Sequence, residues 1–169
     1  MLKIIGVVLV ISACGGVGFD IAAAQRREER ALHQLVNILD FMECELQYRL
    51  TPLPELCWLC AKEFPQMPGK IFAELATEME QQVLPDVTYC MTSVLDRVKD
   101  IPPITRKEFA LLGRSVGKFD LIGQLKGLDG VRQDCCRNLE QLAYNRDNRL
   151  RSYQTLGLCA GAALAILLI

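Results

Sequence analysis

Residues 32–54 read LHQLVNILDFMECELQYRLTPLP, a helical pattern that stops at two prolines. Apolar side chains recur in it at intervals of three and four residues, which places them on one face of an α-helix. They are Leu32, Leu35, Val36, Leu39, Met42 and Leu46. A proline disfavours helical geometry in the residue before it but is accepted in the first turn of a new helix. We therefore expect one helix from about Gln25 to Leu50, a break at Thr51–Pro54, and a second helix after it.

The chain from this break to residue 152 continues the helical pattern, and no alternating apolar and polar run predicts a strand. Short helices are expected over residues 56–64, 70–83 and 87–98, the last capped by Asp86. Thr105 and Glu108 have the spacing of a capping box, for a helix that stops at Gly117. A long last helix begins near Asp120 with an apolar stripe, and close packing on the first helix would explain its glycines. That stripe and those glycines are Ile122, Leu125, Leu128, Val131, Cys135, Leu139 and Leu142, with Gly123, Gly127 and Gly130.

Length and charge restrict the class of protein. The 169 residues are 51% hydrophobic, enough for one ordinary domain, and the net charge of −1 disfavours a nucleic-acid partner. Residues 20–100 carry an excess of six negative charges and residues 101–169 an excess of four positive charges. This asymmetry would orient a charged partner or a neighbouring copy, although solvated helix faces that differ by chance explain it equally well.

Both ends of the chain are apolar. Ile4–Phe19 and Thr155–Ile169 carry no charge and are short for membrane helices, so we expect a membrane helix over residues 1–24 and a membrane segment over 153–169. Gly157 and Gly161 have the four-residue spacing that lets membrane helices pack closely. Basic residues gather on the inner side of both segments, which predicts that the helical domain, residues 25–152, is cytoplasmic. These residues are Arg26, Arg27, Arg30, Arg149 and Arg151.

Two other interpretations compete with a membrane scaffold. Ile11–Cys14 resembles a lipoprotein processing site, which would make the chain an extracytoplasmic lipoprotein attached at Cys14. Cys57 and Cys60 form a C-x-x-C pair, the spacing of thiol redox and zinc sites, but no second matched pair and no strand–helix setting accompanies it. The only histidine, His33, has no partner residues for a catalytic triad. We therefore expect no enzyme activity, no metal, no cofactor and no small-molecule substrate.

Two motifs resemble those of the stage III sporulation protein AB family of endospore-forming bacteria. The first is an acidic-apolar-x-Tyr-x-x-Thr-Pro-Leu-x-Glu pattern, which runs here from Glu45 to Glu55. The second pattern consists here of Val116, Gly117, Asp120, Gln124 and Leu128, and the two apolar ends match as well. The resemblance implies a helical domain like the inner-membrane platform protein of type II secretion. It also implies a structural component of the sporulation channel in the mother-cell membrane around the forespore.

The resemblance further implies partners and roles for the motif residues. The partners are the cytoplasmic secretion ATPase of the same system, stage III sporulation protein AA, and other membrane components of the channel. Tyr48, Thr51 and Pro52 would form a hinge in which Thr51 caps the second helix and Tyr48 buries its ring. Glu45 and Glu55 would face solvent or the partner, and Asp120 and Gln124 would either cap the last helix or contact the partner. We expect the ATPase to bind through charged residues, which makes its binding sensitive to salt.

Overall fold

The computed structural model describes residues 2–81, 86–117 and 120–168, with side chains for residues 23–81, 86–117 and 120–145. This part of the chain contains helices and no strand, so the all-α prediction is confirmed. The helices are α1 (Leu2–Tyr48), α2 (Leu53–Glu63), α3 (Met67–Glu80), α4 (Val87–Arg97), α5 (Pro103–Ser115) and α6 (Leu121–Leu168).

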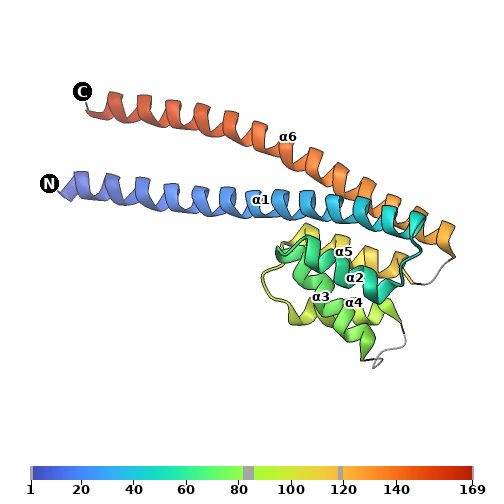
Figure 1. Cartoon of the computed structure of the whole chain (residues 1–169). Helices are drawn as coiled ribbons and strands as arrows, with labels where there is room; N and C mark the ends of the chain where they lie inside the picture. The colour runs from blue at the N-terminus through green and yellow to red at the C-terminus, as the bar shows by residue number, and fades with distance from the viewer. Residues whose placement is uncertain (1, 82–85, 118–119, 169) are drawn as a thin grey trace.

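The two longest helices, α1 and α6, run antiparallel and carry the other four at one end (Figure 1). At a rise of about 1.5 Å per residue, each long helix spans roughly 70 Å. Their register is fixed where the Gln25 Nε2 donates to the Leu142 carbonyl at 2.9 Å and where Arg132 Nε lies 3.7 Å from Asp40 Oδ1. Helices α2–α5 pack beneath the C-terminal half of α1, and both chain termini project to the opposite end.

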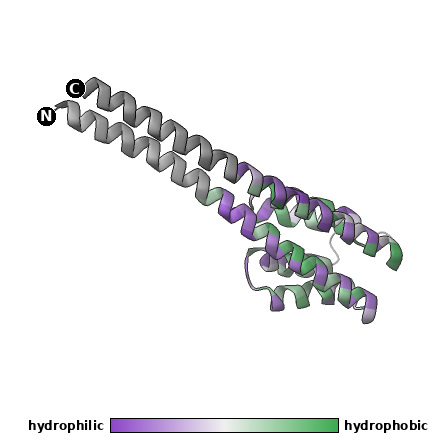
Figure 2. Ribbon diagram, turned by 90° about the horizontal axis from the view of Figure 1, so that it is seen from above, coloured by the Kyte–Doolittle hydropathy of each residue, from purple (hydrophilic) through white to green (hydrophobic). Residues whose placement is uncertain are grey.

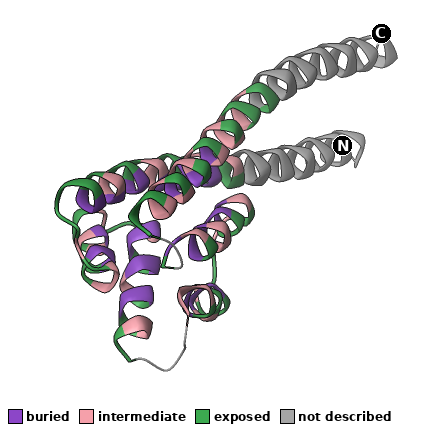
Figure 3. Ribbon diagram, turned by 90° about the vertical axis from the view of Figure 1, so that its right-hand side faces the viewer, coloured by how far each residue is buried: buried purple, intermediate pink, exposed green. Residues whose placement is uncertain are grey.

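The apolar stripes of all six helices meet in one core, which holds the four short helices to the long pair (Figures 2 and 3). Every predicted stripe residue of α1 is buried except the half-buried Val36, and Ile38 joins them. Phe72 of α3 and Phe109 of α5 meet edge to face with ring centroids 5.6 Å apart. Such aromatic pairs add to the stabilisation that burial of the rings already gives.

A buried carboxylate links α1 to the start of α5. Glu28 is only 5% exposed, and its two oxygens accept hydrogen bonds from the Thr105 amide (2.7 Å), the Thr105 hydroxyl (2.7 Å) and the Ile104 amide (3.2 Å). The N-cap residue of α5 is Pro102, which has no side chain able to accept such bonds. Glu28 therefore caps α5 from another helix and satisfies amides that a helix leaves free in its first turn.

Several predicted helix ends are wrong. The first helix does not begin at Gln25, because α1 is continuous from Leu2. The capping box is absent because Pro102 and Pro103 start α5 earlier, which leaves Thr105 and Glu108 buried inside the helix. Likewise α3 begins at Met67 because Pro68 is accepted in a first turn.

Other predicted ends are confirmed. The Asp86 carboxylate accepts a hydrogen bond from the Thr88 amide at the start of α4. α5 ends just before Gly117, whose φ of +89° favours glycine and where a Cβ would lie 2.6 Å from a Val87 methyl carbon.

Gly127 and Gly130 of α6 do not pack as predicted. A Cβ on Gly127 would lie 2.8 Å from the Cβ of Ser115, so this glycine admits α5 rather than α1. A Cβ on Gly130 would have no atom within 4 Å, and nothing in the packing requires a glycine there. Ile122, predicted in the buried stripe, is 63% exposed because it lies at the free end of the helix pair.

No described helix has an apolar stretch long enough to cross a membrane. The side chains of residues 1–22 and 146–169, which include most of the two predicted membrane segments together with Gly157 and Gly161, lie outside the described residues.

Candidate protein-binding site at the α1–α2 hinge

The first motif forms the hinge at which the chain leaves α1 and enters α2. Leu50 adopts a positive φ of 53°, which is uncommon for a residue with a side chain, and Pro52 is extended with ψ of 144°. Leu53 and Pro54 then open α2, whose first turn accepts a proline. The hinge thus separates α1 from α2 by four residues, Arg49–Pro52, because the left-handed residue and the proline both exclude further helix.

Glu45 lies inside the hinge and not on its outer surface. Its side chain is held by the Thr51 hydroxyl, which donates to Oε2 at 3.2 Å, and by Arg49, whose guanidinium lies 3.3 Å from Oε1. The residue is 9% exposed, so the prediction that it faces solvent or a partner is wrong. Glu45 closes the hinge from within, whereas Glu55 is exposed on α2.

Thr51 and Tyr48 also differ from their predicted roles. Thr51 does not cap α2, because Pro52 occupies the N-cap position and the Thr51 hydroxyl is directed to Glu45. Tyr48 does not bury its ring: the side chain is 78% exposed at the end of α1. The hinge is therefore stabilised by the bonds of Thr51 and Arg49 to Glu45, and its aromatic side chain remains available for contact.

Exposed apolar side chains gather at this end of the helix pair, which we call the distal end and define by Tyr48, Leu50, Leu121 and Ile122. Leu50 is 66% exposed, and the antiparallel register of α1 and α6 brings the start of α6 to the level of the hinge. Asp120 starts α6 there, since its carboxylate accepts a hydrogen bond from the Gly123 amide at 3.1 Å. The Gln124 amide donates to the Asp120 carbonyl at 2.9 Å.

A second surface, the basic groove, lies between α4 and α5. This cavity of about 390 Å³ is lined by Arg106, Lys107 and Arg114, with Thr92, Leu95 and Ala110 among its other walls. Arg106 is paired with Asp96 at 2.8 Å. Lys107 and Arg114 are exposed and form no ion pair with any described side chain. Part of the positive charge excess of residues 101–169 is therefore concentrated in the basic groove.

The cysteines of the C-x-x-C pair are fully buried in the core. Burial raises the pKa of Cys57 far above its usual value, with a smaller contribution from Cys60. Burial, and then the negative charge of Glu45, raises the pKa of Cys60 to about 12. Both thiols are therefore neutral and poor nucleophiles or metal ligands at physiological pH. The described residues contain no cluster of three or more cysteine, histidine or acidic side chains that would hold a metal ion.

The fold defines a class of all-helical proteins in which a long antiparallel helix pair carries a four-helix unit at one end. The chain belongs to the Stage III sporulation protein AB family, whose profile matches residues 3–169. It is 27% identical over 178 residues to Stage III sporulation protein AB of Bacillus subtilis (strain 168), covering 99% of each chain. The solved structure of a Stage III sporulation protein AB has the same fold, with a TM-score of 0.60 and 18% identity. That match covers 72% of this chain and 98% of the solved one. Family membership supports a role in sporulation.

The sequence indicates only part of the distal end. The sequence motif marks Tyr48 and Thr51, but no local pattern shows that Leu50, Leu121 and Ile122 form an exposed group. Nor does a local pattern mark Glu28. Leu50 follows Leu46 by four residues and would continue the buried face of the helix, so the local pattern gives no signal of its exposure.

Proposed function

We propose that this chain is a membrane-anchored scaffold of the secretion-like channel in the mother-cell membrane around the forespore. In this proposal residues 1–24 and 153–169 are membrane helices and the helical unit lies in the mother-cell cytoplasm. Support comes from the uncharged runs at both ends, from the arginines that flank them, and from the common end of the helix pair to which both runs lead. The role is structural and involves no catalysis.

We propose further that the distal end docks the cytoplasmic sporulation ATPase, stage III sporulation protein AA. The observation that carries this step is the exposure of Tyr48, Leu50 and Ile122 together, since exposed apolar groups mark protein-binding surfaces and tyrosine is frequent at their energetic centres. Tyr48 is 24 residues beyond Ala24, or about 36 Å along α1. A surface at that distance is accessible to a large cytoplasmic partner. The exposed charges of Arg49 and Glu55 flank it and would give the association a salt dependence.

Binding of the purified ATPase to the full chain in lipid nanodiscs tests this proposal. We expect Tyr48→Ala combined with Ile122→Ser to weaken binding at least tenfold, because truncation of a central aromatic anchor costs about 2 kcal/mol or more. Tyr144→Ala is the matched control: this tyrosine is 70% exposed on α6, 22 residues after Ile122 or about 33 Å along the helix, and its loss should leave the affinity unchanged.

The basic groove provides the competing docking surface. If Lys107→Glu with Arg114→Glu abolishes binding while the distal-end variant binds normally, the ATPase docks between α4 and α5 and the distal end is excluded. Absence of binding between folded partners would contradict ATPase docking altogether. Titration at low and high salt separates the two surfaces further, because an interface centred on Lys107 and Arg114 should weaken steeply with salt.

A further inference from the structure

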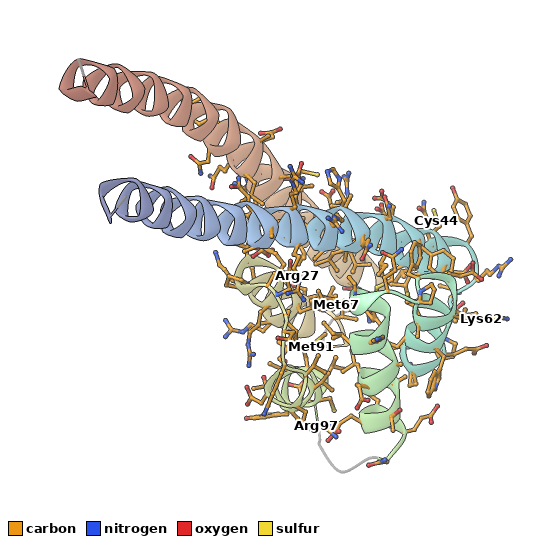
Figure 4. All side chains as sticks on the ribbon, turned by 90° about the vertical axis from the view of Figure 1, so that its left-hand side faces the viewer. Arg27, Cys44, Lys62, Met67, Met91 and Arg97 are labelled. Atoms are coloured by element: carbon orange, nitrogen blue, oxygen red, sulfur yellow. The ribbon has the colours of Figure 1, made fainter. Side chains whose placement is uncertain are left out.

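A third surface lies where the four-helix unit meets α1 on the side of the chain termini. A cavity of about 210 Å³ opens there between α1, the turn before α3 and the turn before α5. Arg27 and Arg30 line it from α1, together with Gln34 one turn further on. Gln66 and Asp100 line it from the two turns. Viewed from the side of the termini, Arg27 lies beside Met67, the first residue of α3 (Figure 4). We call this cavity the arginine pocket.

The polar groups of the arginine pocket are suited to an anion. Residues three apart share a helix face, so the two guanidinium groups converge on one side of α1. Both arginines are exposed, and neither forms an ion pair with a described side chain. The N-cap residue of α3, Gln66, makes no side-chain capping bond and lines the pocket together with Met67, so the positive dipole end of that helix borders the pocket.

The charge balance of the pocket selects among anions. Two arginines and one carboxylate, Asp100, leave a single net positive charge. Guanidinium groups bind phosphate oxygens through paired hydrogen bonds. A phosphodiester carries one negative charge and neutralises this balance, whereas a phosphate monoester or inorganic phosphate, at about −1.5 to −2 near neutral pH, would leave the filled pocket with a net negative charge beside Asp100.

We propose that the arginine pocket binds the phosphodiester headgroup of an anionic membrane phospholipid. This inference rests on the proposed membrane anchoring. Arg27 and Arg30 follow Ala24, the last residue of the apolar run, by three and six residues, or about 4.5 and 9 Å along the helix. The headgroup layer on each side of a bilayer is about 5–8 Å deep, so Arg27 would lie within it and Arg30 just beyond its outer edge, from where a long arginine side chain reaches a headgroup. A bound headgroup would fix the angle of the four-helix unit relative to the membrane, since it joins α1 to the starts of α3 and α5.

Native mass spectrometry of the full chain, released from neutral detergent micelles with added lipid, tests the pocket. We expect the wild-type chain to bind phosphatidylglycerol in preference to phosphatidylcholine, whose ammonium group would oppose the arginines. Arg27→Gln with Arg30→Gln should remove this preference, with a loss of about fivefold for each arginine. The matched control is Arg26→Gln with Lys62→Gln, which removes two exposed positive charges that do not line the pocket and should keep the preference. Asp100→Asn should increase phosphatidylglycerol binding, because it removes a repulsive charge and asparagine tolerates the positive φ of 71° at this position.

Three outcomes would overturn the assignment. An unchanged lipid preference in the Arg27/Arg30 variant would exclude the pocket, and an equal loss in the control variant would reduce the effect to general charge attraction. Inorganic phosphate that displaces phosphatidylglycerol at equal concentration would identify a free-anion site in place of a lipid site. Failure of the membrane anchor is distinguished by a separate measurement, alkaline extraction from phosphatidylcholine vesicles. If that treatment releases the chain while the lipid preference persists, the anchor is wrong and the pocket stands.

Discussion

Removal of the Glu28 carboxylate should destabilise the protein more than any exposed glutamate would. In Glu28→Ala, the amides of Ile104 and Thr105 and the Thr105 hydroxyl lose their acceptor at the start of α5. A hydrogen bond to a charged group contributes about 1.5–3 kcal/mol, and a buried donor left without a partner costs about 1–3 kcal/mol.

The full free-energy cost of leaving three donors without an acceptor is not expected, because Glu28 borders a cavity of about 260 Å³ from which water can reach the vacated site. Water would restore part of the lost hydrogen bonding, which brings the expected loss to about 2–4 kcal/mol. Thr105→Val removes only the hydroxyl donor and should cost about 1 kcal/mol. The graded pair of variants thus separates loss of the whole cap from loss of one bond.

Urea denaturation of residues 25–152, followed by circular dichroism at 222 nm, measures these differences. Glu74→Ala is the matched control, since Glu74 is exposed on α3 and its replacement should change stability by no more than about 0.5 kcal/mol. Hydrogen exchange should also accelerate most at the first turn of α5 in Glu28→Ala. A loss below about 1 kcal/mol, or exchange unchanged at that turn, would refute the capping role of Glu28.

Three further predictions concern the helical unit alone. Residues 25–152, expressed without the apolar ends, should form a soluble, mainly helical domain that is monomeric or weakly associating, and substantial strand content by circular dichroism would contradict this. Glu108→Gln should stabilise that fragment near neutral pH, because burial, followed by the charge of Asp134, raises the pKa of Glu108 and so disfavours the ionised side chain in the folded state. Because the pKa of Glu108 is raised in the folded state, the wild-type fragment loses stability as the pH rises through that pKa. The extra stability of Glu108→Gln should therefore vanish in acid. Extra stability that persists in acid would exclude titration of Glu108 as its cause. In the native fragment a thiol reagent should modify the exposed Cys44 first and leave Cys57 and Cys60 unmodified. Replacement of both buried cysteines, Cys57→Ala with Cys60→Ala, should lower stability by about a few kcal/mol without loss of function. Rapid modification of Cys57 and Cys60 would show that the pair is not merely packed in the core.

The fold was predictable where one local signal decides the structure. The stripe from Leu32 to Leu46 follows from periodicity and is confirmed, and a helix break follows from proline geometry, although it lies at Arg49–Pro52, two residues before the predicted Thr51–Pro54. The cap of α5 could not be predicted, because Glu28 lies 76 and 77 residues before the groups that it binds. Thr105 and Glu108 have capping-box spacing, but local spacing does not reveal that Pro102 and Pro103 have already started the helix.

The candidate site was predictable in position but not in orientation. The motif marked the hinge, yet nothing in its spacing states on which side of the turn each residue lies. The positive φ of Leu50 decides this, because it turns the chain so that Thr51 reaches back to Glu45 while Tyr48 remains outside. Exposure of Ile122 depends on how far α6 extends beyond its contact with α1, which is a property of the tertiary register and not of the local pattern.

Accessibility of Cys44 in vegetative cells that express the chain tests the central claim most directly, namely that both ends anchor the chain while the helical unit lies in the cytoplasm, because a single membrane there separates the cytoplasm from the reagent. Cys44 is exposed on α1 near the distal end, whereas Cys57 and Cys90 are buried and unsuitable as probes. The measurement is labelling by a membrane-impermeant thiol reagent in a full chain with Cys14, Cys136 and Cys159 replaced by serine, compared with the same chain that also carries Cys44→Ser. The account predicts that Cys44 is protected in intact protoplasts and labelled after lysis. Labelling of Cys44 in intact protoplasts would place the helical unit outside the cytoplasm and contradict the scaffold and its docking to a cytoplasmic ATPase.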